Sequence, residues 1–328
     1  IEMVSVVTGA TGCLGMSLTK RLVQEGHEVI ALGRNLELGA LLTQMGAGFV
    51  PVDLRDLNQL KKTCSKADYV FNCAALSSPW GPYEAFYQSN VLGTEHVVAA
   101  TPDQARLIHV SSPSIYFDFT EKHNIKENEP LPVRPANNYV KTKLLAEEAV
   151  DKAFLNQKIK VVTIRPRAIF GPYDRAILPR ILEAERKGVL SIIGSGANVI
   201  DITYVENVVE SLILAAKADD KVLGKKYNIT NDEPKTLMAI LTLLYSELGK
   251  PLKVRSVSYS VAKVIAPILD ALHRTGLLAG EPVMTQYTAG VMALGQTLNI
   301  EAAKEDLHYR PLVSIEQGMK QFANWYRA

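Results

Sequence analysis

The chain has 328 residues, of which 47% are hydrophobic and 21% are charged, and its 36 basic and 34 acidic side chains give a net charge of +2. Because the two signs are interspersed and no basic run stands out, the composition excludes a protein that binds nucleic acid through its charge. A chain of this length exceeds the usual limit for one hydrophobic core, so we expect one large domain with a smaller lobe, or two domains.

Short β-branched runs alternate with helical patterns through the first half of the chain. Strand, helix and strand repeated in this way predict an α/β fold with a doubly wound parallel (Rossmann) sheet of six or more strands. The expected strands are 3–8, 27–32, 48–52, 69–74, 107–111 and 160–165, and the expected helices are 14–25, 36–45, 57–64, 85–99 and 139–153. The segment 117–138 is rich in Pro, Glu and Asn, which is typical of a long loop.

The regular alternation breaks after Pro172. Helical patterns at 176–186 and 205–216 flank a short strand near Ile192 and a glycine-rich turn, and apolar residues at helical spacing between 237 and 248 predict a further helix before Pro251. We therefore expect residues 1–172 to form a dinucleotide-binding domain, with 200–232 packing back onto it. Residues 173–199 and 233–328 are expected to form a smaller, mainly helical substrate lobe.

The most apolar segment runs from Val257 to Leu278, but polar and charged residues interrupt it. This pattern argues against a transmembrane span. The segment is expected to line an apolar pocket, to touch a membrane surface or simply to pack the smaller lobe.

Three cysteines at 13, 64 and 73 have no metal-ligand spacing and cannot form a disulfide framework, and the six histidines share no such spacing either. The chain starts with an apolar strand and without the pattern of a signal peptide. These observations favour a cytoplasmic protein without a metal site.

A Gly-x-x-Gly-x-x-Gly loop follows the first expected strand and opens the first expected helix. Glycines in this position let backbone N–H groups approach a pyrophosphate, and the helix N-terminus stabilises its negative charge. The alternative is a glycine-rich turn without function. The loop residues expected to bind the dinucleotide are Gly9, Thr11, Gly12, Cys13, Leu14 and Gly15.

The end of the second strand indicates which dinucleotide is preferred. An acidic residue there would bind the adenosine ribose hydroxyls, whereas Arg34, followed by Asn35, can pair with a 2′-phosphate. We therefore expect NADP(H) to be preferred, with NAD(H) possible and a solvated surface arginine as the alternative. Asp53 and Leu54, after the third strand, are expected beside the adenine, although an Asp there is also common in turns.

Tyr139 and Lys143 are four residues apart, so they share one face of an expected helix. A nearby ammonium lowers the pKa of a phenol and makes it a usable general acid or base. The pattern alone is also common on amphipathic surface helices, so its meaning depends on the nucleotide site that precedes it.

The order of these motifs resembles that of the extended short-chain dehydrogenase/reductases, over nearly the whole chain. Within them, the chain is most similar to the 3β-hydroxysteroid dehydrogenase group, and closest to the NADPH-dependent 2-alkyl-3-oxoalkanoate reductases of bacterial olefin biosynthesis. The motifs that carry the resemblance are the glycine loop, Asn72-Cys73-Ala74-Ala75, Ser111-Ser112, Tyr139-x-x-x-Lys143 and Arg165-Pro166-Arg167-Ala168-Ile169-Phe170-Gly171-Pro172. Less diagnostic similarities lie at 80–83, 88–94, 194–198 and 280–285.

The resemblance implies that Ser112 hydrogen-bonds the substrate oxygen, Tyr139 exchanges the proton, and Lys143 holds the nicotinamide ribose while lowering the pKa of Tyr139. Asn90 would bend its helix and hold a water, with an ordinary capping amide as the alternative. Ser112 is preferred to Ser111, which would point to the other face of the strand, and Ser114 is a further candidate. Further residues are expected at the cofactor, Ala74, Ala75, Pro166 and Ile169, and at the substrate, Trp80, Asn198, Tyr204 and Met284, where the turn from Asn198 to Tyr204 would close the cleft.

The chain departs from the family pattern at two positions. Asn72 stands where many relatives have histidine, and Pro113 follows the expected catalytic serine. Sugar-nucleotide dehydratases carry an Asp-Glu pair directly after that hydroxyl residue, so Pro113 and Ser114 at these positions argue against dehydration.

The leading hypothesis is an NADP(H)-dependent oxidoreductase that interconverts a secondary alcohol and a ketone on an apolar substrate, a 3-oxoacyl or 3β-hydroxysteroid-like molecule. The alternatives are a nucleotide-sugar epimerase with tightly bound NAD and, less in keeping with an intact Tyr and Lys, a non-catalytic dinucleotide sensor. No nucleic-acid partner is expected. A homodimer through the helices that carry Asn90 and Tyr139 is implied by analogy.

Overall fold

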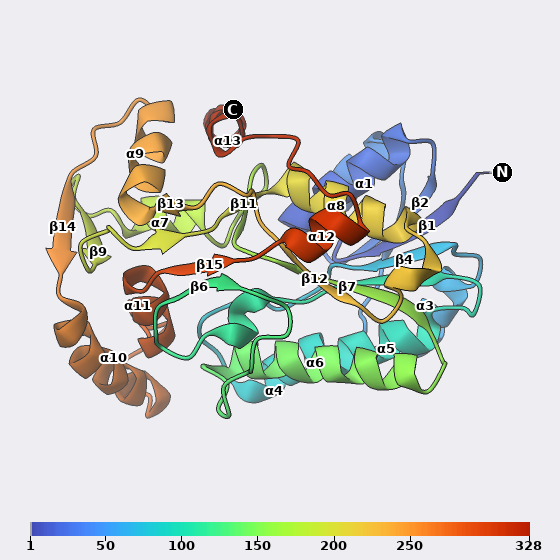
Figure 1. Ribbon diagram of the computed structural model, residues 1–328, viewed down its shortest axis with the longest axis horizontal. Coiled ribbons are helices and arrows are strands. Elements are labelled where there is room, and N and C mark those ends of the chain that lie inside the picture. Colours follow the sequence, from blue (N-terminus) through green and yellow to red (C-terminus); the bar gives the residue numbers. More distant parts are fainter. Residues whose placement is uncertain (1) are drawn as a thin grey trace.

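A computed structural model describes residues 2–328, and its larger part is built on a seven-stranded parallel sheet in the order β12-β7-β5-β4-β1-β2-β3 (Figure 1). This confirms the expected doubly wound fold. The strands are β1 (Val4–Thr8), β2 (Glu28–Gly33), β3 (Gly48–Pro51), β4 (Tyr69–Asn72), β5 (Arg106–Val110), β7 (Lys160–Pro166) and β12 (Lys226–Ile229).

Helices cover both faces of this sheet, because successive strand residues point to opposite sides. Val6 of β1 lies in the hydrophobic cluster under α3, α5 and α6, whereas its neighbour Val7 lies in the cluster under α1, α2 and α8. Figure 1 shows α1 and α8 on one side and α5 and α6 on the other. The helices are α1 (Cys13–Gln24), α2 (Leu36–Gln44), α3 (Leu57–Cys64), α5 (Gly93–Ala100), α6 (Asn138–Leu155) and α8 (Val205–Lys217).

The strand order reverses beside β1, which lies between β2 and β4. The chain runs outward through β2 and β3, and then crosses to β4 on the other side of β1 and continues through β5 and β7. In open parallel sheets, ligands bind at the carboxyl ends of the strands beside such a switch point. The loops after β1, β4, β5 and β7 are therefore the place to look for a site.

The smaller part contains a four-stranded sheet in the order β13-β10-β15-β6 and a two-stranded sheet of β9 and β14. The prediction that 117–138 is a loop throughout is wrong, since β6 lies in it and pairs with β15. The strand is only four residues long and its burial does not alternate, so no local pattern marks it as a strand. The elements are β6 (Lys122–Ile125), β9 (Leu190–Ile193), β10 (Val199–Ile200), β13 (Lys235–Thr236), β14 (Val254–Val257), β15 (Gln296–Leu298), α7 (Leu178–Ala184), α9 (Leu237–Glu247), α10 (Tyr259–Arg274) and α11 (Gln286–Ala293).

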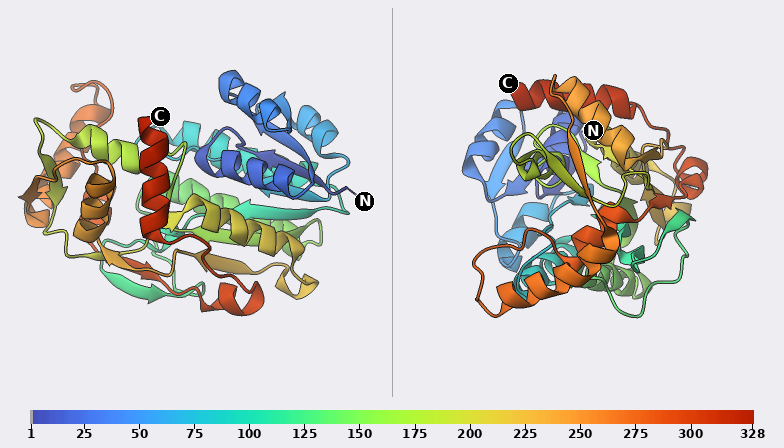
Figure 2. Two further views of the ribbon diagram at one scale, coloured as in Figure 1. Left: turned by 90° about the horizontal axis from the view of Figure 1, so that it is seen from above. Right: turned by 90° about the vertical axis from the view of Figure 1, so that its left-hand side faces the viewer.

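The sequence assigns the last two helices to the smaller lobe, but the first of them packs on the large sheet and the second lies between the two parts. Helix α12 (Glu301–Asp306) packs against β12 of the large sheet, and the Tyr309 hydroxyl that follows donates to the carbonyl of Thr230, 2.8 Å away. Helix α13 (Ile315–Arg327) contacts α9 and β11 (Thr203–Tyr204) and stands between the two parts (Figure 2). The chain thus returns to the large sheet after the smaller lobe.

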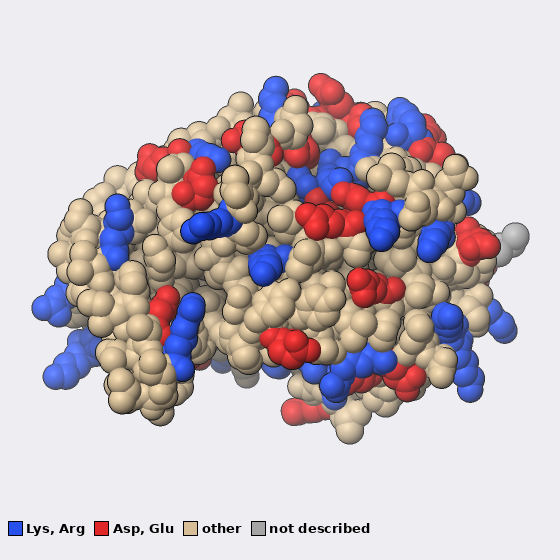
Figure 3. Space-filling view, turned by 90° about the horizontal axis from the view of Figure 1, so that it is seen from below, with Lys and Arg blue, Asp and Glu red and all other residues tan. Residues whose placement is uncertain are grey.

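The apolar segment 257–278 mainly forms α10, which buries only Ala262 and Ala266. Four of its aliphatic residues are exposed, Val261, Val264 (66%), Ile265 and Ile268 (55%), so the interpretation that the segment simply packs the smaller lobe does not hold for this face of the helix. Among residues 2–328, no helix is long and apolar enough to cross a membrane. On the face shown in Figure 3, basic and acidic side chains are intermixed.

Candidate active site

The glycine loop joins β1 to α1 as the sequence predicts, and its backbone is tightly packed. Gly9 has a φ of +62°, and a Cβ there would lie 2.7 Å from the backbone nitrogen of Ala74. The Gly12 N–H donates to the carbonyl of Gly9 at 3.0 Å, which closes the turn. Only glycine meets both demands at position 9, a left-handed conformation and contact with a neighbouring backbone.

The N-terminus of α1 is open toward this loop. Gly12 is the N-cap residue and supplies no side chain to accept from the first N–H groups of the helix. Free N–H groups and the positive end of the helix dipole suit a pyrophosphate. The Cys13 thiol is turned inward, with Sγ donating to the carbonyl of Pro172 at 3.3 Å, and burial raises its pKa. The residues present therefore fit a dinucleotide, with Cys13 contributing its backbone.

The expected cofactor residues after β2 and β3 have different local roles. Arg34 is exposed, and within residues 2–328 its guanidinium makes no hydrogen bond or ion pair. The side chain of Asn35 caps α2 by accepting from Leu38 N at 3.0 Å. Asp53 pairs with Arg55 at 2.6 Å, and this partner holds the pKa of the Asp53 carboxyl down to about 2. In the described part of the chain, the Arg34 guanidinium is thus free to pair with a ligand at this edge of the sheet.

Leu54 packs against a helix, whereas Ala75 is exposed in the loop after β4. The side chain of Leu54 lies against Gly93 in α5, and its carbonyl lies 2.7 Å from the Nδ1 of His96. Ala75 is exposed after β4, and the N–H of the preceding Ala74 donates to the Thr8 hydroxyl oxygen at 3.3 Å. The loop after β4 thus lies directly beside the glycine turn.

Tyr139 stands at the start of α6, where Asn137 caps the helix by accepting from Val140 N at 2.9 Å. The phenol faces the hydroxyls of Ser112 and Ser77, from the ends of β5 and β4. Burial raises the pKa of Tyr139 above its usual value of 10, while both serines lower it. Tyr139 is therefore protonated at neutral pH and available as an acid.

Ser112 and its two neighbouring serines have separate surroundings. The Ser112 hydroxyl is partly exposed and lies 2.7 Å from the Ser114 hydroxyl, at the start of a 3-10 helix (Pro113–Tyr116). Ser111 is buried and donates to Glu147 at 2.5 Å. Ser112 is the serine of this group that faces Tyr139, as the alternation along the strand predicts.

Lys143 lies one turn after Tyr139 and is fully buried. Its ammonium donates to the carbonyl of Val110 at 2.8 Å. Burial lowers the pKa of Lys143 to about 8, against the opposing effect of Glu147. The expectation that Lys143 lowers the pKa of Tyr139 is not met in this structure, because the ammonium is directed at the strand carbonyl and the dominant effect on the phenol is burial.

A buried network near Tyr139 and Ser112 fixes the ends of β5 and β7. Arg165 forms an ion pair with Glu147 and donates to the Tyr116 hydroxyl at 2.6 Å. The same Glu147 carboxylate accepts from Ser111. Because α6, β5 and β7 all contribute to this network, it sets the position of α6, and hence of Tyr139, relative to Ser112.

Asn90 lies in a π-helical turn (Tyr87–Leu92) between α4 (Tyr83–Phe86) and α5. Its side-chain oxygen accepts from Leu76 N at 2.8 Å, and its amide donates to the Leu76 carbonyl and to the Thr142 hydroxyl at 3.1 Å. Asn90 is fully buried and ties the loop after β4 to α6. The helix is irregular at this position, where the sequence predicts a bend.

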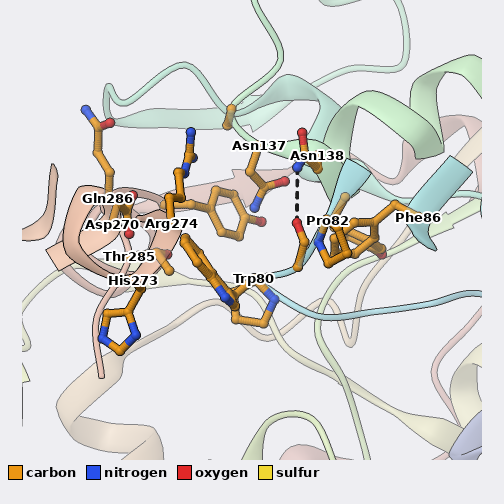
Figure 4. A pocket seen from close by; sticks show the side chains of 15 residues that line it. Trp80, Pro82, Phe86, Asn137, Asn138, Asp270, His273, Arg274, Thr285 and Gln286 are labelled. Atoms are coloured by element: carbon orange, nitrogen blue, oxygen red, sulfur yellow. Dashed lines mark hydrogen bonds between the residues drawn. The ribbon is translucent and has the colours of Figure 1, made fainter. Parts of the chain in front are cut away.

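A cavity of about 500 Å³ opens beside Tyr139. Figure 4 shows Asp270, His273 and Arg274 of α10 on one side and Pro82 and Phe86 on the other, with Trp80 between them. The Arg274 guanidinium lies 5.7 Å from the Trp80 ring centre. Trp80 is therefore the expected substrate residue that the structure brings to the cavity, although its ring is partly covered by α10.

Sequence reasoning missed Tyr287, which lines this cavity and packs edge-on against Phe117 at 5.6 Å. Arg167 was named only as part of a motif, yet its charge acts on the phenols of both Tyr139 and Tyr287. Tyr287 follows the stretch 280–285 that carries part of the family resemblance, and that proximity was the available signal. No local pattern marks either residue as part of a site.

Tyr204 is the one expected substrate residue that the structure places in the core. It is 1% exposed, its ring packs 5.4 Å from that of Phe170, and its hydroxyl bonds Gln321. The prediction that Tyr204 faces the substrate is therefore wrong. The strand pairing of β11 with β8 (Ile169–Phe170) turns this side chain inward.

Asn198 and Met284 do not line the cavity beside Tyr139 either. Asn198 donates to the carbonyl of Met292 at 3.0 Å and so holds the end of α11, while Met284 packs against the small hydrophobic cluster of Ile193 and Ala289. Of the two residues expected at the nicotinamide, Pro166 ends β7 and is buried, and Ile169 is partly exposed. Pro166 is thus the last residue of the strand that leads into the site, and Ile169 follows three residues later.

Residues 5–230 match the model of the family described as "NAD dependent epimerase/dehydratase family". The chain belongs to this family. The match covers the glycine loop, Ser112, Tyr139 and Lys143, and ends just after β12. The resemblance drawn from the motifs is thereby confirmed, and the family's dependence on NAD agrees with the open N-terminus of α1.

Two relatives of known name are similar over nearly their whole length. The chain is 33% identical to a 2-alkyl-3-oxoalkanoate reductase of Shewanella oneidensis, covering 96% of this chain and 84% of the relative. It is 30% identical to a mouse sterol-4-alpha-carboxylate 3-dehydrogenase, decarboxylating, covering 96% and 88%. A UDP-glucuronic acid 4-epimerase of Bacillus cereus, solved with NAD, has a TM-score of 0.79 at 20% identity over 99% of both chains, which shows a shared fold.

Proposed function

We propose that the protein is an NADP(H)-dependent oxidoreductase that interconverts a secondary alcohol and a ketone on an apolar substrate. The observation that carries the proposal is the Tyr139 phenol facing the Ser112 hydroxyl beside a cavity, with Lys143 one turn away on the same helix. A phenol and a hydroxyl that converge in this way can hold one substrate oxygen between them.

Each residue has a role in the proposed reaction. A bound nicotinamide supplies or accepts hydride at the reacting carbon. In the reduction, Tyr139 donates its proton to the substrate oxygen, and Ser112 donates a hydrogen bond to the same oxygen. Because burial raises the pKa of Tyr139, the phenol is protonated at neutral pH and can serve as the proton donor. Lys143 holds the ribose and so the position of the cofactor ring.

For the substrate, we propose a 3-oxo acid or a related 3-oxygenated molecule with an apolar body. The names of both relatives describe compounds with an oxygen function at carbon 3 and a carboxylate attached one carbon away. Apolar groups for such a body are present at the cavity, contributed by Trp80, Pro82 and Phe86.

The proposed function is tested by following NADPH oxidation with a panel of ketones and 3-oxoacyl compounds. Turnover of several apolar 3-oxo compounds supports it. A protein that is purified with NAD already bound and turns over only UDP-sugars would instead be an epimerase, and the proposal would be wrong. The solved epimerases are similar to this chain in fold, at 20 to 22% identity.

Arg34 is expected to set the preference for NADP(H). Substituting Arg34→Ala removes the exposed guanidinium that can pair with a 2′-phosphate, so NADPH binding should weaken about 10-fold while NADH binding changes little. The dissociation constants follow from the fluorescence of the bound cofactors. The variant Arg55→Ala, at the arginine that pairs with Asp53, is the matched control and should retain the preference. An unchanged NADPH-to-NADH ratio in Arg34→Ala would contradict the assignment.

Ketone reduction is expected to slow as the pH rises above about 8, the pKa to which burial lowers Lys143. Below that pH Lys143 is charged and can hold the cofactor ribose, and above it the charge is lost. The measurement is kcat/KM for the ketone between about pH 6 and pH 10. In Lys143→Arg the charge persists, so the decline near pH 8 should disappear, and an identical decline would remove Lys143 as its cause.

A further inference from the structure

Arg167 is held firmly at the end of β7, at the edge of the candidate active site. Its N–H donates to the carbonyl of Ile229 at 2.9 Å, and its carbonyl accepts from the Thr203 hydroxyl. The next residue, Ala168, has a φ of +42°, which is strained for a residue with a Cβ. The chain therefore turns sharply directly after Arg167, and the backbone of this arginine is fixed by strands on both sides.

The side chain of Arg167, in contrast, has no partner among the residues that the structure describes. Its Nε is buried, and within residues 2–328 the guanidinium makes no hydrogen bond and no ion pair. Arg165, two residues earlier, is fully satisfied by Glu147 and Tyr116. A partly buried guanidinium without an acceptor is costly, and a ligand that brings an acceptor recovers that cost.

Arg167 leaves the sheet beside Ser112, because β7 is the neighbour of β5 and the two strands pair up to Ile164 opposite Val110. Its charge lowers the pKa of both Tyr139 and Tyr287, the two phenols that line the cavity. Burial raises the pKa of the Asp201 carboxyl to about 6, against the opposing effect of the Arg167 charge. The Oδ2 of Asp201 accepts from Leu298 N at 2.8 Å. No ion pair joins Asp201 to Arg167 in the described chain, so this carboxyl does not satisfy the guanidinium.

The phosphates of the cofactor are not the partner of Arg167. The pyrophosphate site lies at the end of β1, and Arg34 follows β2, whereas Arg167 follows β7. In the sheet, β5 and β4 separate β7 from β1. With strands about 4.8 Å apart, this separation is roughly 14 Å, beyond the reach of a direct contact with the glycine loop.

We propose that Arg167 binds a carboxylate of the substrate. This carboxylate is bonded to the carbon adjacent to the one that carries the reacting oxygen, as in a 3-oxo acid. The inference rests on the proposed function, since it takes Tyr139 as the residue that holds this oxygen. A guanidinium acting on the same phenol can reach a carboxylate only a short distance along the substrate, and its planar N–H groups suit both carboxylate oxygens. Arg167 thus selects 3-oxo acids over neutral ketones.

The test compares an acid with its neutral ester in the oxidation direction, where both compounds are stable. We would measure kcat/KM for 2-hexyl-3-hydroxydecanoate and its methyl ester with NADP+, in wild type, Arg167→Gln and Arg167→Lys. In Arg167→Gln we expect a loss of about 100-fold for the acid, mainly through KM, and a change within about threefold for the ester. Arg167→Lys should restore part of the activity on the acid, because it keeps the charge.

Arg175→Gln is the matched control, since Arg175 is an exposed arginine on the following loop and the substitution removes the same charge. It should leave both substrates unchanged. Unaltered NADPH fluorescence in Arg167→Gln would show that the variant is folded and binds cofactor. If the wild type oxidises neither compound, the proposed substrate class is wrong and the inference falls with it. If the wild type oxidises the ester as well as the acid, or Arg167→Gln slows both equally, the proposed function stands and the role of Arg167 is overturned.

Discussion

Substituting Tyr139→Phe should reduce ketone turnover by at least about 1000-fold while leaving the binding of NADPH nearly unchanged. The phenol is the proposed proton donor, and phenylalanine keeps the ring that packs against Val140 and Ile115. The loss should therefore lie in kcat, with little change in the free energy of unfolding. Initial rates of NADPH oxidation and fluorescence titration of the cofactor give the two quantities.

Tyr287→Phe is the matched control, because it removes a second phenol from the same cavity. Since Ser112 faces Tyr139, loss of the Tyr287 hydroxyl should slow the reaction far less. Full activity of Tyr139→Phe, or equal losses in the two variants, would remove Tyr139 from the proton-transfer step.

Substituting Arg165→Met should lower the free energy of unfolding by about 3–5 kcal/mol. The change leaves the Glu147 carboxylate buried without its ion-pair partner, and also removes the donor to the Tyr116 hydroxyl. Because this network joins α6 to β5 and β7, turnover should fall as well. Urea denaturation followed by circular dichroism measures the stability, and the ketone assay measures the activity.

The double variant Arg165→Met/Glu147→Gln separates the buried charge from simple loss of packing. Removing the charge on both sides should recover at least half of the lost stability, since the neutral amide can still accept from Ser111. If the double variant is less stable than Arg165→Met alone, the cost of the single change comes from packing, and the uncompensated carboxylate is not its cause.

Local patterns were sufficient for the parts of the fold that repeat. The alternation of apolar strands with amphipathic helices predicted all seven strands of the large sheet except β12, and the glycine loop predicted the β1–α1 turn. A parallel strand that is buried on both faces, such as β5 with its Arg106-to-Val110 run, stands out as a short apolar segment. Periodicity of this kind depends only on neighbours in the chain.

The smaller lobe was predicted less well, because its elements are short and pair over long sequence distances. Strand β6 pairs with β15, about 170 residues later, and α12 returns to pack on β12. The position of Tyr204 in the core follows from the pairing of β11 with β8, which no local pattern reveals. Its aromatic character was equally compatible with a cavity wall and with a core.

The sequence by itself determined the dinucleotide fold, the glycine turn, and the Tyr139 and Lys143 pair on one helical face, because these depend on spacing within single elements. Only the tertiary structure decided that Ser112 faces Tyr139, that Lys143 is directed at Val110, and that burial keeps the phenol protonated. It also brought Tyr287 to the cavity beside Tyr139, and placed Arg167, whose buried Nε has no partner in the described chain, after the strand next to that of Ser112. Solvent exclusion and the convergence of distant strands set these properties, and neither is encoded in the spacing of neighbouring residues.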